Sequence, residues 1–275
     1  MFNVLKTTAI AGLLLTVAAS SCSGDKRAEE ARGLLENARA LVTAHDYPAA
    51  IAALDTLDKK YRDCLDVRRE GTLVRLTALS DLSRDSLASA ELQLSGVQTA
   101  VAELAPRFKK IEVDGTGGYY VDNAAYTGQE MNKTGIQARV DDEGYCFVVA
   151  NVAGRRIGLN SISFGDVSTQ PTQSVEVEGS EIMSLTQEAA APLVEALALC
   201  PDKTATVTLV GSKGKVSAKL DARQLDAFRA SWDYARALQR QRRLLINLER
   251  LTRQLQRLDD QLANSTPATD EDDKQ

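Results

Sequence analysis

Apolar residues recur at helical spacing between Glu29 and Lys60, with a single interruption. The first apolar stripe contains Leu34, Leu35, Ala38, Leu41 and Val42, and the second contains Ala50, Ile51, Leu54 and Leu57. Between the stripes, residues 45–48 read His-Asp-Tyr-Pro, a composition typical of a turn. The pattern therefore predicts a helical hairpin.

The second half of this hairpin resembles the second helix of a tetratricopeptide-type repeat. The resemblance rests on Asp46-Tyr47, Ala50-Ile51, Leu54, Leu57 and Lys60-Tyr61, and it covers about one repeat. In that family the tyrosine packs at the turn, the small alanine lets the paired helix approach closely, and such hairpins bind protein segments. Because a lone repeat cannot bury its own apolar face, we expect the hairpin to pack on later helices, and we favour packing over segment binding as its role.

A heptad pattern follows between Val67 and Phe108. One set of apolar residues spaced by seven contains Leu87, Leu94, Val101 and Phe108, and a second set contains Ala90, Val97, Leu104 and Ile111. Both sets lie along one seam of a long helix, whose last turn is weakened by Pro106.

A matching helix is predicted near the other end of the chain. It begins with a capping box at Asp221 and Gln224 and runs through Trp232 to a seam formed by Leu248, Leu251, Leu255, Leu258 and Leu262. Each long helix has about 40 residues, or about 60 Å at 1.5 Å per residue. Because their lengths match, and because the second is rich in arginine where the first is mildly acidic, we predict an antiparallel coiled-coil pair, termed the stalk.

The segment between the two helices, about residues 111–220, is β-rich and forms the predicted head. We predict one hairpin from strands 144–152 and 155–164 with a tight turn at residues 153–154, and a second from strands 204–210 and 215–220. A further strand is expected at 174–178, and a helix at 187–199, announced by Ser184 and ended by Cys200-Pro201.

The predicted fold class is therefore α+β: a long antiparallel helical stalk, an inserted β-rich head and an N-terminal helical hairpin. The expected divisions are residues 1–21, 22–66 (anchor and hairpin), 67–110 (first stalk helix), 111–220 (head), 221–263 (second stalk helix) and 264–275. The last segment is polar and acidic, and we expect it to be disordered.

The N-terminal segment has the features of an export signal. Lys6 precedes an apolar run from Ala9 to Ala19, and Ser20 and Ser21 lead directly into Cys22. The run is shorter than the roughly 20 residues that a membrane-spanning helix needs. A secretory signal peptide with an incidental cysteine is the alternative.

Residues 19–22, Ala-Ser-Ser-Cys, resemble the lipobox of bacterial lipoproteins, with alanine where leucine is usual, a variation that we associate with the Bacteroidota. The resemblance implies that residues 1–21 are removed as a signal peptide. Cys22 would then carry a thioether-linked diacylglycerol and an N-acyl chain such as palmitate. It also implies anchoring in the outer membrane, at its periplasmic face or at the cell surface, because two or more acyl chains give stable attachment.

Composition narrows the classes of partner. The formal net charge of −5 gives no reason to expect nucleic acid as a partner. Beyond Cys22 the cysteines are Cys64, Cys146 and Cys200. Cys146 and Cys200 are the one pair within the predicted head, and they are candidates for a disulfide, with two buried free thiols as the alternative.

The sequence offers little catalytic chemistry. Its one histidine, His45, lies in the predicted helix turn, so no triad or zinc-protease motif can be built around it, and we expect no cofactor and no metal. The glycine-rich stretches 115–118 and 211–215 lack phosphate-loop spacing and are interpreted as turns. Residues 141–143 (Asp-Asp-Glu) are interpreted as an acidic turn, with calcium binding as the alternative.

The leading hypothesis is a non-enzymatic lipoprotein that acts as a structural or protein-interaction module of the cell envelope and contacts another envelope protein. The first alternative is a glycan-binding or peptide-binding surface lipoprotein, with a candidate recognition surface at Tyr119, Tyr120, Tyr126 and Tyr145. A hydrolase whose carboxylates are dispersed along the chain is the second. The oligomeric state stays open.

Overall fold

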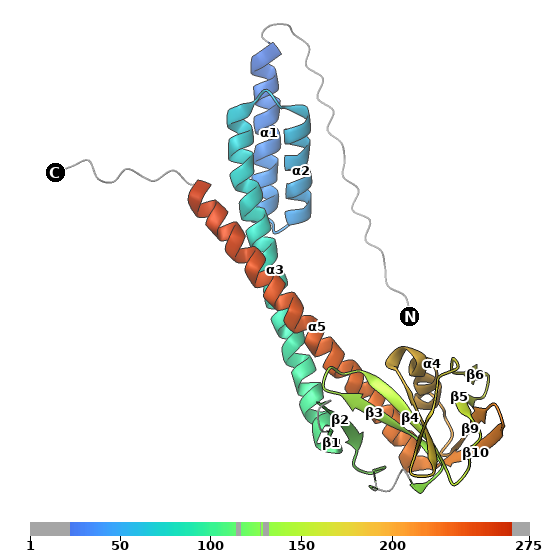
Figure 1. The fold of residues 1–275 in the computed structure, drawn as a ribbon. Coiled ribbons are helices and arrows are strands. Elements are labelled where there is room, and N and C mark those ends of the chain that lie inside the picture. The colour runs from blue at the N-terminus through green and yellow to red at the C-terminus, as the bar shows by residue number, and fades with distance from the viewer. Residues whose placement is uncertain (1–22, 114–116, 127, 129–131, 266–275) are drawn as a thin grey trace. The chain divides into compact units, whose positions relative to one another are not determined.

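The computed structural model describes residues 23–113, 117–126, 128 and 132–265 and has a mixed α and β fold. The chain divides into two compact units, one made of Met1–Ser83 with Leu255–Gln275 and the other of Arg84–Gln254. Both boundaries fall inside the two longest helices, α3 (Leu65–Leu104) and α5 (Ala222–Ser265), so each unit contains part of both (Figure 1). The predicted signal peptide, Cys22 and most of the acidic tail lie outside the described residues.

The first unit contains the predicted helical hairpin, which is confirmed. Helices α1 (Ser23–Thr43) and α2 (Tyr47–Lys60) are joined by a turn in which His45 has a positive φ of 58°. Asp46 caps α2 by accepting a hydrogen bond from the backbone N–H of Ala49 at 3.2 Å. Pro48 lies in the first turn of α2, where a missing N–H costs nothing.

The apolar stripes of the hairpin form a small core with the first turns of α3. Its buried members are Ala31, Leu35, Ala38, Leu54, Leu57 and Val67. A Cβ at Gly71 of α3 would lie 3.0 Å from Cδ2 of Leu57, so this glycine allows a close approach of the two helices. The hairpin therefore packs on a later helix, as its pattern predicted.

The second unit contains two antiparallel sheets. The six-stranded sheet has the order β1-β2-β3-β4-β8-β7, and the four-stranded sheet has the order β10-β9-β5-β6. The strands of the first are β1 (Phe108–Val113), β2 (Gly117–Asp122), β3 (Gly135–Asp141), β4 (Cys146–Ala153), β7 (Val175–Val177) and β8 (Ser180–Leu185). Those of the second are β5 (Leu159–Phe164), β6 (Val167–Ser168), β9 (Ala205–Gly211) and β10 (Gly214–Leu220).

The predicted hairpin of residues 144–152 and 155–164 is wrong, although both strands exist. β4 pairs with β3 and β8 in the larger sheet, whereas β5 pairs with β6 and β9 in the smaller one. Residues 154–158 carry the chain from one sheet to the other, with positive φ at Gly154 and Gly158. The glycine after Ala153 thus belongs to a crossover, and not to a tight hairpin turn.

The other predictions for this region are largely confirmed. β9 and β10 form the second hairpin, with Gly211 paired opposite Gly214, and β7 lies within the predicted strand. Helix α4 (Gln187–Ala198) is present, but its N-cap is Thr186, whose side chain accepts from the N–H of Ala189. Ser184, which we expected to announce the helix, lies in β8.

Helix α3 ends earlier than its heptad pattern predicted. A 3₁₀ turn, η1 (Ala105–Arg107), follows Leu104 and contains Pro106, so Phe108 and Ile111 lie in β1 and not on the helical seam. Proline interrupts helical hydrogen bonding, which accounts for the change. The remaining seam positions of this half of α3 are buried or half-buried: Leu87, Ala90, Leu94, Val97, Val101 and Leu104.

Helix α5 begins with the predicted capping box. The N–H of Gln224 donates to Oδ1 of Asp221, and the N–H of Asp221 donates to Oε1 of Gln224, both at 2.9 Å. The first turns of α5 belong to the core of the second unit, because Leu225, Phe228 and Tyr234 are buried among the strands. Trp232 is partly buried and packs against the same core. Farther along, Leu251 and Leu258 are buried.

Candidate functional site

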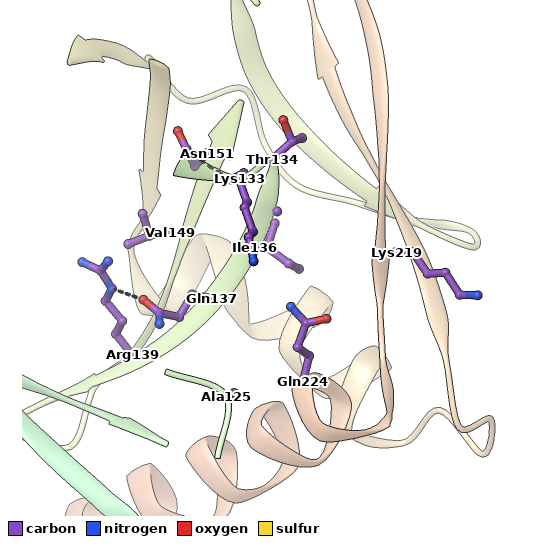
Figure 2. Close-up of a pocket in the computed structure, with 11 residues that line it drawn as sticks. Ala125, Lys133, Thr134, Ile136, Gln137, Arg139, Val149, Asn151, Lys219 and Gln224 are labelled. Carbon is purple, nitrogen blue, oxygen red and sulfur yellow. Dashed lines mark hydrogen bonds between the residues drawn. The ribbon is translucent and has the colours of Figure 1, made fainter. Parts of the chain in front are cut away.

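The second unit contains a cavity of about 240 Å³ beside β3 and β4, termed the β3–β4 pocket (Figure 2). Its polar lining comes from Lys133, Thr134, Gln137, Arg139, Asn151, Lys219 and Gln224. Ala125, Ile136 and Val149 supply apolar surface. None of these residues belongs to a site predicted from the sequence.

Strand alternation and register bring the lining together. On β3, Gln137 and Arg139 alternate with Ile136, Ala138 and Val140, which are buried in the core, so the two polar side chains face away from it. Gln137 pairs with Val149 of β4, and Gly135 pairs with Asn151, which places these residues on one face. The capping box adds Gln224 from the first turn of α5.

Hydrogen bonds within the described residues fix the polar side chains of the pocket. Oε1 of Gln137 accepts from Nε of Arg139 at 2.8 Å, and the guanidinium carbon of Arg139 lies 4.3 Å from the ring centroid of Tyr119. Nδ2 of Asn151 donates to the carbonyl of Lys133 at 2.9 Å. This bond ties the segment before β3 to β4 and thereby holds Lys133 at the pocket.

The charge of the lining is positive. Lys133, Arg139 and Lys219 are cationic, and none of the described lining residues is Asp or Glu. In Figure 2 the ammonium group of Lys219 points away from the other labelled side chains, whereas that of Lys133 lies between the amide groups of Gln137 and Gln224 in this view. The pocket thus offers hydrogen-bond donors and positive charge beside apolar walls.

The four tyrosines of the candidate recognition surface have different surroundings. Tyr120 packs edge-on against Tyr234, with ring centroids 5.7 Å apart, and contacts the core. Burial and a hydrogen bond to Asp142 raise the pKa of Tyr120. Lys109 lies over the ring of Tyr126 at 5.8 Å.

The other two tyrosines are connected through Phe147. Tyr119 lies edge-on to the ring of Phe147, with centroids 6.2 Å apart, and Phe147 and Tyr145 line a second hollow at the end of β8. Tyr145 is the most exposed tyrosine, at 45%. Of the predicted surface, Tyr145 is therefore the residue best placed to meet a partner.

Cys146 and Cys200 are free thiols in the structure, and not a disulfide. Both are buried in the core of the second unit, the ordinary environment of a structural cysteine. Burial raises the pKa of Cys146 to about 12, which keeps its thiol protonated and unreactive.

The acidic turn binds protein groups through each of its side chains. Oδ1 of Asp141 accepts hydrogen bonds from the N–H groups of Glu143 and Tyr145. Asp142 forms an ion pair with Lys110, and Glu143 forms one with Arg242, both at 2.9 Å. In the described part of the chain, no group of three or more His, Cys, Asp and Glu is placed to hold a metal ion.

The glycine-rich turn between β9 and β10 is occupied in a similar way. The N–H of Ser212 donates to the carbonyl of Gly158, and that of Lys213 donates to the carbonyl of Ile157. These amides therefore point at the β4–β5 crossover and are not open to a phosphate. In the other glycine-rich stretch, residues 115–118, the first two residues lie outside the described part of the chain, and Gly117 and Gly118 begin β2.

His45 has a local structural role in the hairpin turn. Its Nδ1 lies 2.6 Å from the hydroxyl of Tyr47, and Tyr47 is buried at the turn. The contact joins two neighbouring residues and lies within the first unit.

Sequence reasoning missed two buried carboxylates of the second unit. Asp122, paired with Arg107, also accepts from the N–H of Ala124, and Arg107 bonds Asp226 of α5 at 2.6 Å. Glu181 of β8 is only 4% exposed. No local pattern marks these residues, because their partners are distant in the chain or belong to the backbone.

Glu181 holds the β4–β5 crossover to the larger sheet. Its carboxylate accepts from the N–H groups of Ile157 at 3.0 Å, Gly158 at 2.9 Å and Leu159 at 3.1 Å. Burial alone would raise the pKa of Glu181, but the three backbone hydrogen bonds and the charge of Lys213 outweigh it and lower the pKa below its usual value.

No protein-family model matches the chain, and neither does any curated protein or any solved structure. Among the described residues, no helix combines the length and apolar character that crossing a membrane requires.

Proposed function

We propose that the protein is a lipoprotein of the bacterial outer membrane, anchored at its periplasmic face or at the cell surface through acyl chains on Cys22. The proposal rests on Lys6, the apolar run that follows it and the small residues directly before Cys22. Two or more acyl chains give stable anchoring, at about 0.8 kcal/mol per buried methylene.

We further propose that α3 and α5 pair in antiparallel orientation and carry the second unit as a structural or protein-interaction module of the envelope, without enzymatic activity. The observation that carries this proposal is a pair of contacts with reversed order in sequence. In the first unit, Ser80 of α3 donates to Asp259 of α5 at 2.8 Å. In the second, Arg107, in the 3₁₀ turn that follows α3, donates to Asp226 of α5 at 2.6 Å. Early residues of one helical segment thus meet late residues of the other.

A second candidate function, ligand binding by the second unit, is favoured by the β3–β4 pocket. Binding sites for small molecules are concave, with apolar walls and a few placed polar groups, and this pocket has both features.

The first function is tested in intact cells with a photo-reactive amino acid at position 145, since Tyr145 is the exposed tyrosine. Irradiation should join the protein to a discrete envelope protein. A photo-reactive residue at position 203, where Lys203 is exposed on the turn after α4, is the matched control and should give no such product.

The same experiment in a Cys22→Ala background tests the anchor. The variant should leave the membrane fraction and lose the crosslinked product, because the acyl chains supply the membrane affinity. If Cys22→Ala still sediments with the outer membrane at high salt, the lipoprotein proposal is wrong. If positions 145 and 203 crosslink alike, the surface around Tyr145 is not an interaction surface.

A further inference from the structure

We propose that the β3–β4 pocket binds the carboxylate group of a small organic acid. This inference rests on the second of the two functions proposed above, since it names the ligand class for the same pocket.

Three polar side chains of the pocket, those of Gln137, Gln224 and Thr134, are arranged as donors. Oε1 of Gln137 already accepts from Arg139, and Oε1 of Gln224 already accepts from the N–H of Asp221. Each glutamine therefore has its –NH₂ group left for a ligand, and no acceptor among the described residues is bonded to either group. Oγ1 of Thr134 likewise accepts, from the N–H of Ala153 at 3.1 Å, which leaves its hydroxyl proton to donate.

Lys133 adds a positive charge to these donors. An ammonium group offers three donors and no acceptor, so it reinforces the polarity set by the glutamines. No ion pair joins Lys133 to a carboxylate among the described residues, and the described lining contains no Asp or Glu. Lys133, Gln137 and Gln224 line the same pocket, and in the view of Figure 2 the ammonium of Lys133 lies between the two amides.

The size and walls of the pocket limit the rest of the ligand. At about 240 Å³ the cavity is smaller than the range of about 300–1,000 Å³ that holds drug-sized molecules. Ile136 and Val149 give it an apolar side. A single sugar acid or a single acylated amino acid meets both conditions, because each combines one carboxylate with a small carbon skeleton.

A carboxylate fits these groups better than a phosphate. It carries one negative charge and two oxygens with about four lone-pair sites, which one ammonium and two amide groups can satisfy. Phosphates are commonly held by backbone N–H groups of glycine-rich loops and helix N-termini. The glycine-rich turn of this unit has its Ser212 and Lys213 amides bonded to backbone carbonyls.

The test is a titration of the purified mature chain, labelled with ¹⁵N and followed by nuclear magnetic resonance. The probes are two matched pairs, glucuronate with glucose and N-acetylglycine with N-acetylglycinamide, together with inorganic phosphate. We expect at least one acid to shift the side-chain –NH₂ signals of Gln137 and Gln224, and its neutral partner to leave them unchanged. The pair that responds distinguishes a sugar acid from an amino-acid carboxylate.

Substitution of Lys133 tests whether the acid binds in this pocket. Lys133→Met should weaken binding of the acid about tenfold, the loss expected for one charge-assisted hydrogen bond, and Lys133→Arg should restore most of it. Lys203→Met, which removes an exposed lysine of the same unit outside the pocket, should bind as the wild type does.

Each other result overturns the inference in a recognisable way. If glucose or phosphate shifts the glutamine signals and neither acid does, the pocket binds ligands but not carboxylates. If Lys133→Met binds the acid as the wild type does, the site is elsewhere. If no probe shifts any signal at millimolar concentration, both the inference and the ligand-binding function fail, while the crosslinking test of the interaction function is unaffected.

Discussion

Replacing Glu181 with glutamine should destabilise the second unit far more than the same substitution at an exposed glutamate. The two side chains have nearly the same shape, so Glu181→Gln leaves no cavity and changes only charge and hydrogen bonding. In the wild type, three consecutive backbone N–H groups, those of Ile157, Gly158 and Leu159, donate to the carboxylate. Oε2 accepts from the first and third, and Oε1 accepts from Gly158.

The expected loss follows from those three bonds. Glutamine can keep its oxygen toward Ile157 and Leu159, but its –NH₂ then faces the N–H of Gly158, and two donors cannot pair. An unsatisfied buried donor costs about 1–3 kcal/mol. The two remaining bonds change from charge-assisted to neutral, at about 1 kcal/mol each, while burying a neutral group is easier than burying a charge. We expect a net loss of about 2–4 kcal/mol in the free energy of unfolding.

Urea denaturation of the mature chain, followed by tryptophan fluorescence, measures this loss. Trp232 is the one tryptophan in the sequence, and it packs on the core of the second unit, so its emission reports that unit. Glu195→Gln, on an exposed position of α4, is the matched control and should change the free energy by less than about 0.5 kcal/mol.

The pH dependence gives an independent check. The pKa of Glu181 is lower in the folded protein than in the unfolded chain, where a glutamate has a pKa of about 4.3. The ionised carboxylate therefore contributes fully to the free energy of unfolding above that pH, and the contribution is lost as the pH falls through the folded pKa. The stability difference between wild type and Glu181→Gln should therefore be largest near neutral pH and should shrink in acid below about pH 4. Equal stability of Glu181→Gln and Glu195→Gln at pH 7 would refute the account of the crossover.

Two further substitutions test the packing. Gly144→Ala should lower the free energy of unfolding by about 2–4 kcal/mol in the same fluorescence assay, because φ is +83° and the added Cβ would lie 2.8 Å from Cβ of Leu238. Gly154→Ala is the control: its φ is also positive, but the added Cβ would have no atom within 4 Å, so the loss should be about 1 kcal/mol. Leu251→Asp should lower the melting temperature, measured by circular dichroism, more than Arg253→Asp, because it places a charge at a position only 6% exposed, whereas Arg253 is exposed. Equal shifts in the second pair would count against pairing of α3 and α5.

The parts of the fold that local patterns predicted are those whose hydrogen bonds close within a few residues. The cap at Asp46 and the capping box of Asp221 and Gln224 each join residues three apart, so their sequences suffice to place them. The β9–β10 hairpin is equally local. The heptad positions of α3 are buried or half-buried up to Leu104. They too could be predicted locally, because the residues on one face of a helix follow from their spacing.

The errors arose where distant partners decide the structure. Phe108 continued the heptad spacing, but it is buried in β1 by stacking on Tyr234, whose ring centroid lies 4.4 Å away. β5, the strand after Gly154, lies in the other sheet because β8 takes the free edge of β4. Glu181 of β8 binds the backbone of the crossover between β4 and β5. Neither partner is visible from the spacing of nearby residues.

The candidate pocket was unpredictable for a related reason. Its lining comes from the segment between β2 and β3, from β3, β4 and β10, and from the start of α5. Long-range pairing brings these residues together. The alternation of Ile136, Ala138 and Val140 with Gln137 and Arg139 does predict a strand with one buried face. It gives no information about what stands opposite the polar face.

The first turns of α5 also change the meaning of the β-rich segment. The sequence predicts residues 111–220 as an inserted head. In the structure, Leu225, Phe228 and Tyr234 of α5 are each at most 4% exposed within the same core as the strands. Removing the strands would expose these three side chains, at about 1.5–3 kcal/mol each, which approaches the whole stability of a typical domain, about 5–15 kcal/mol. We therefore expect the strands and the first part of α5 to unfold together. Gln224, one turn before Phe228, is held at the β3–β4 pocket by that shared core, so the geometry of the pocket depends on the helix as much as on the sheet.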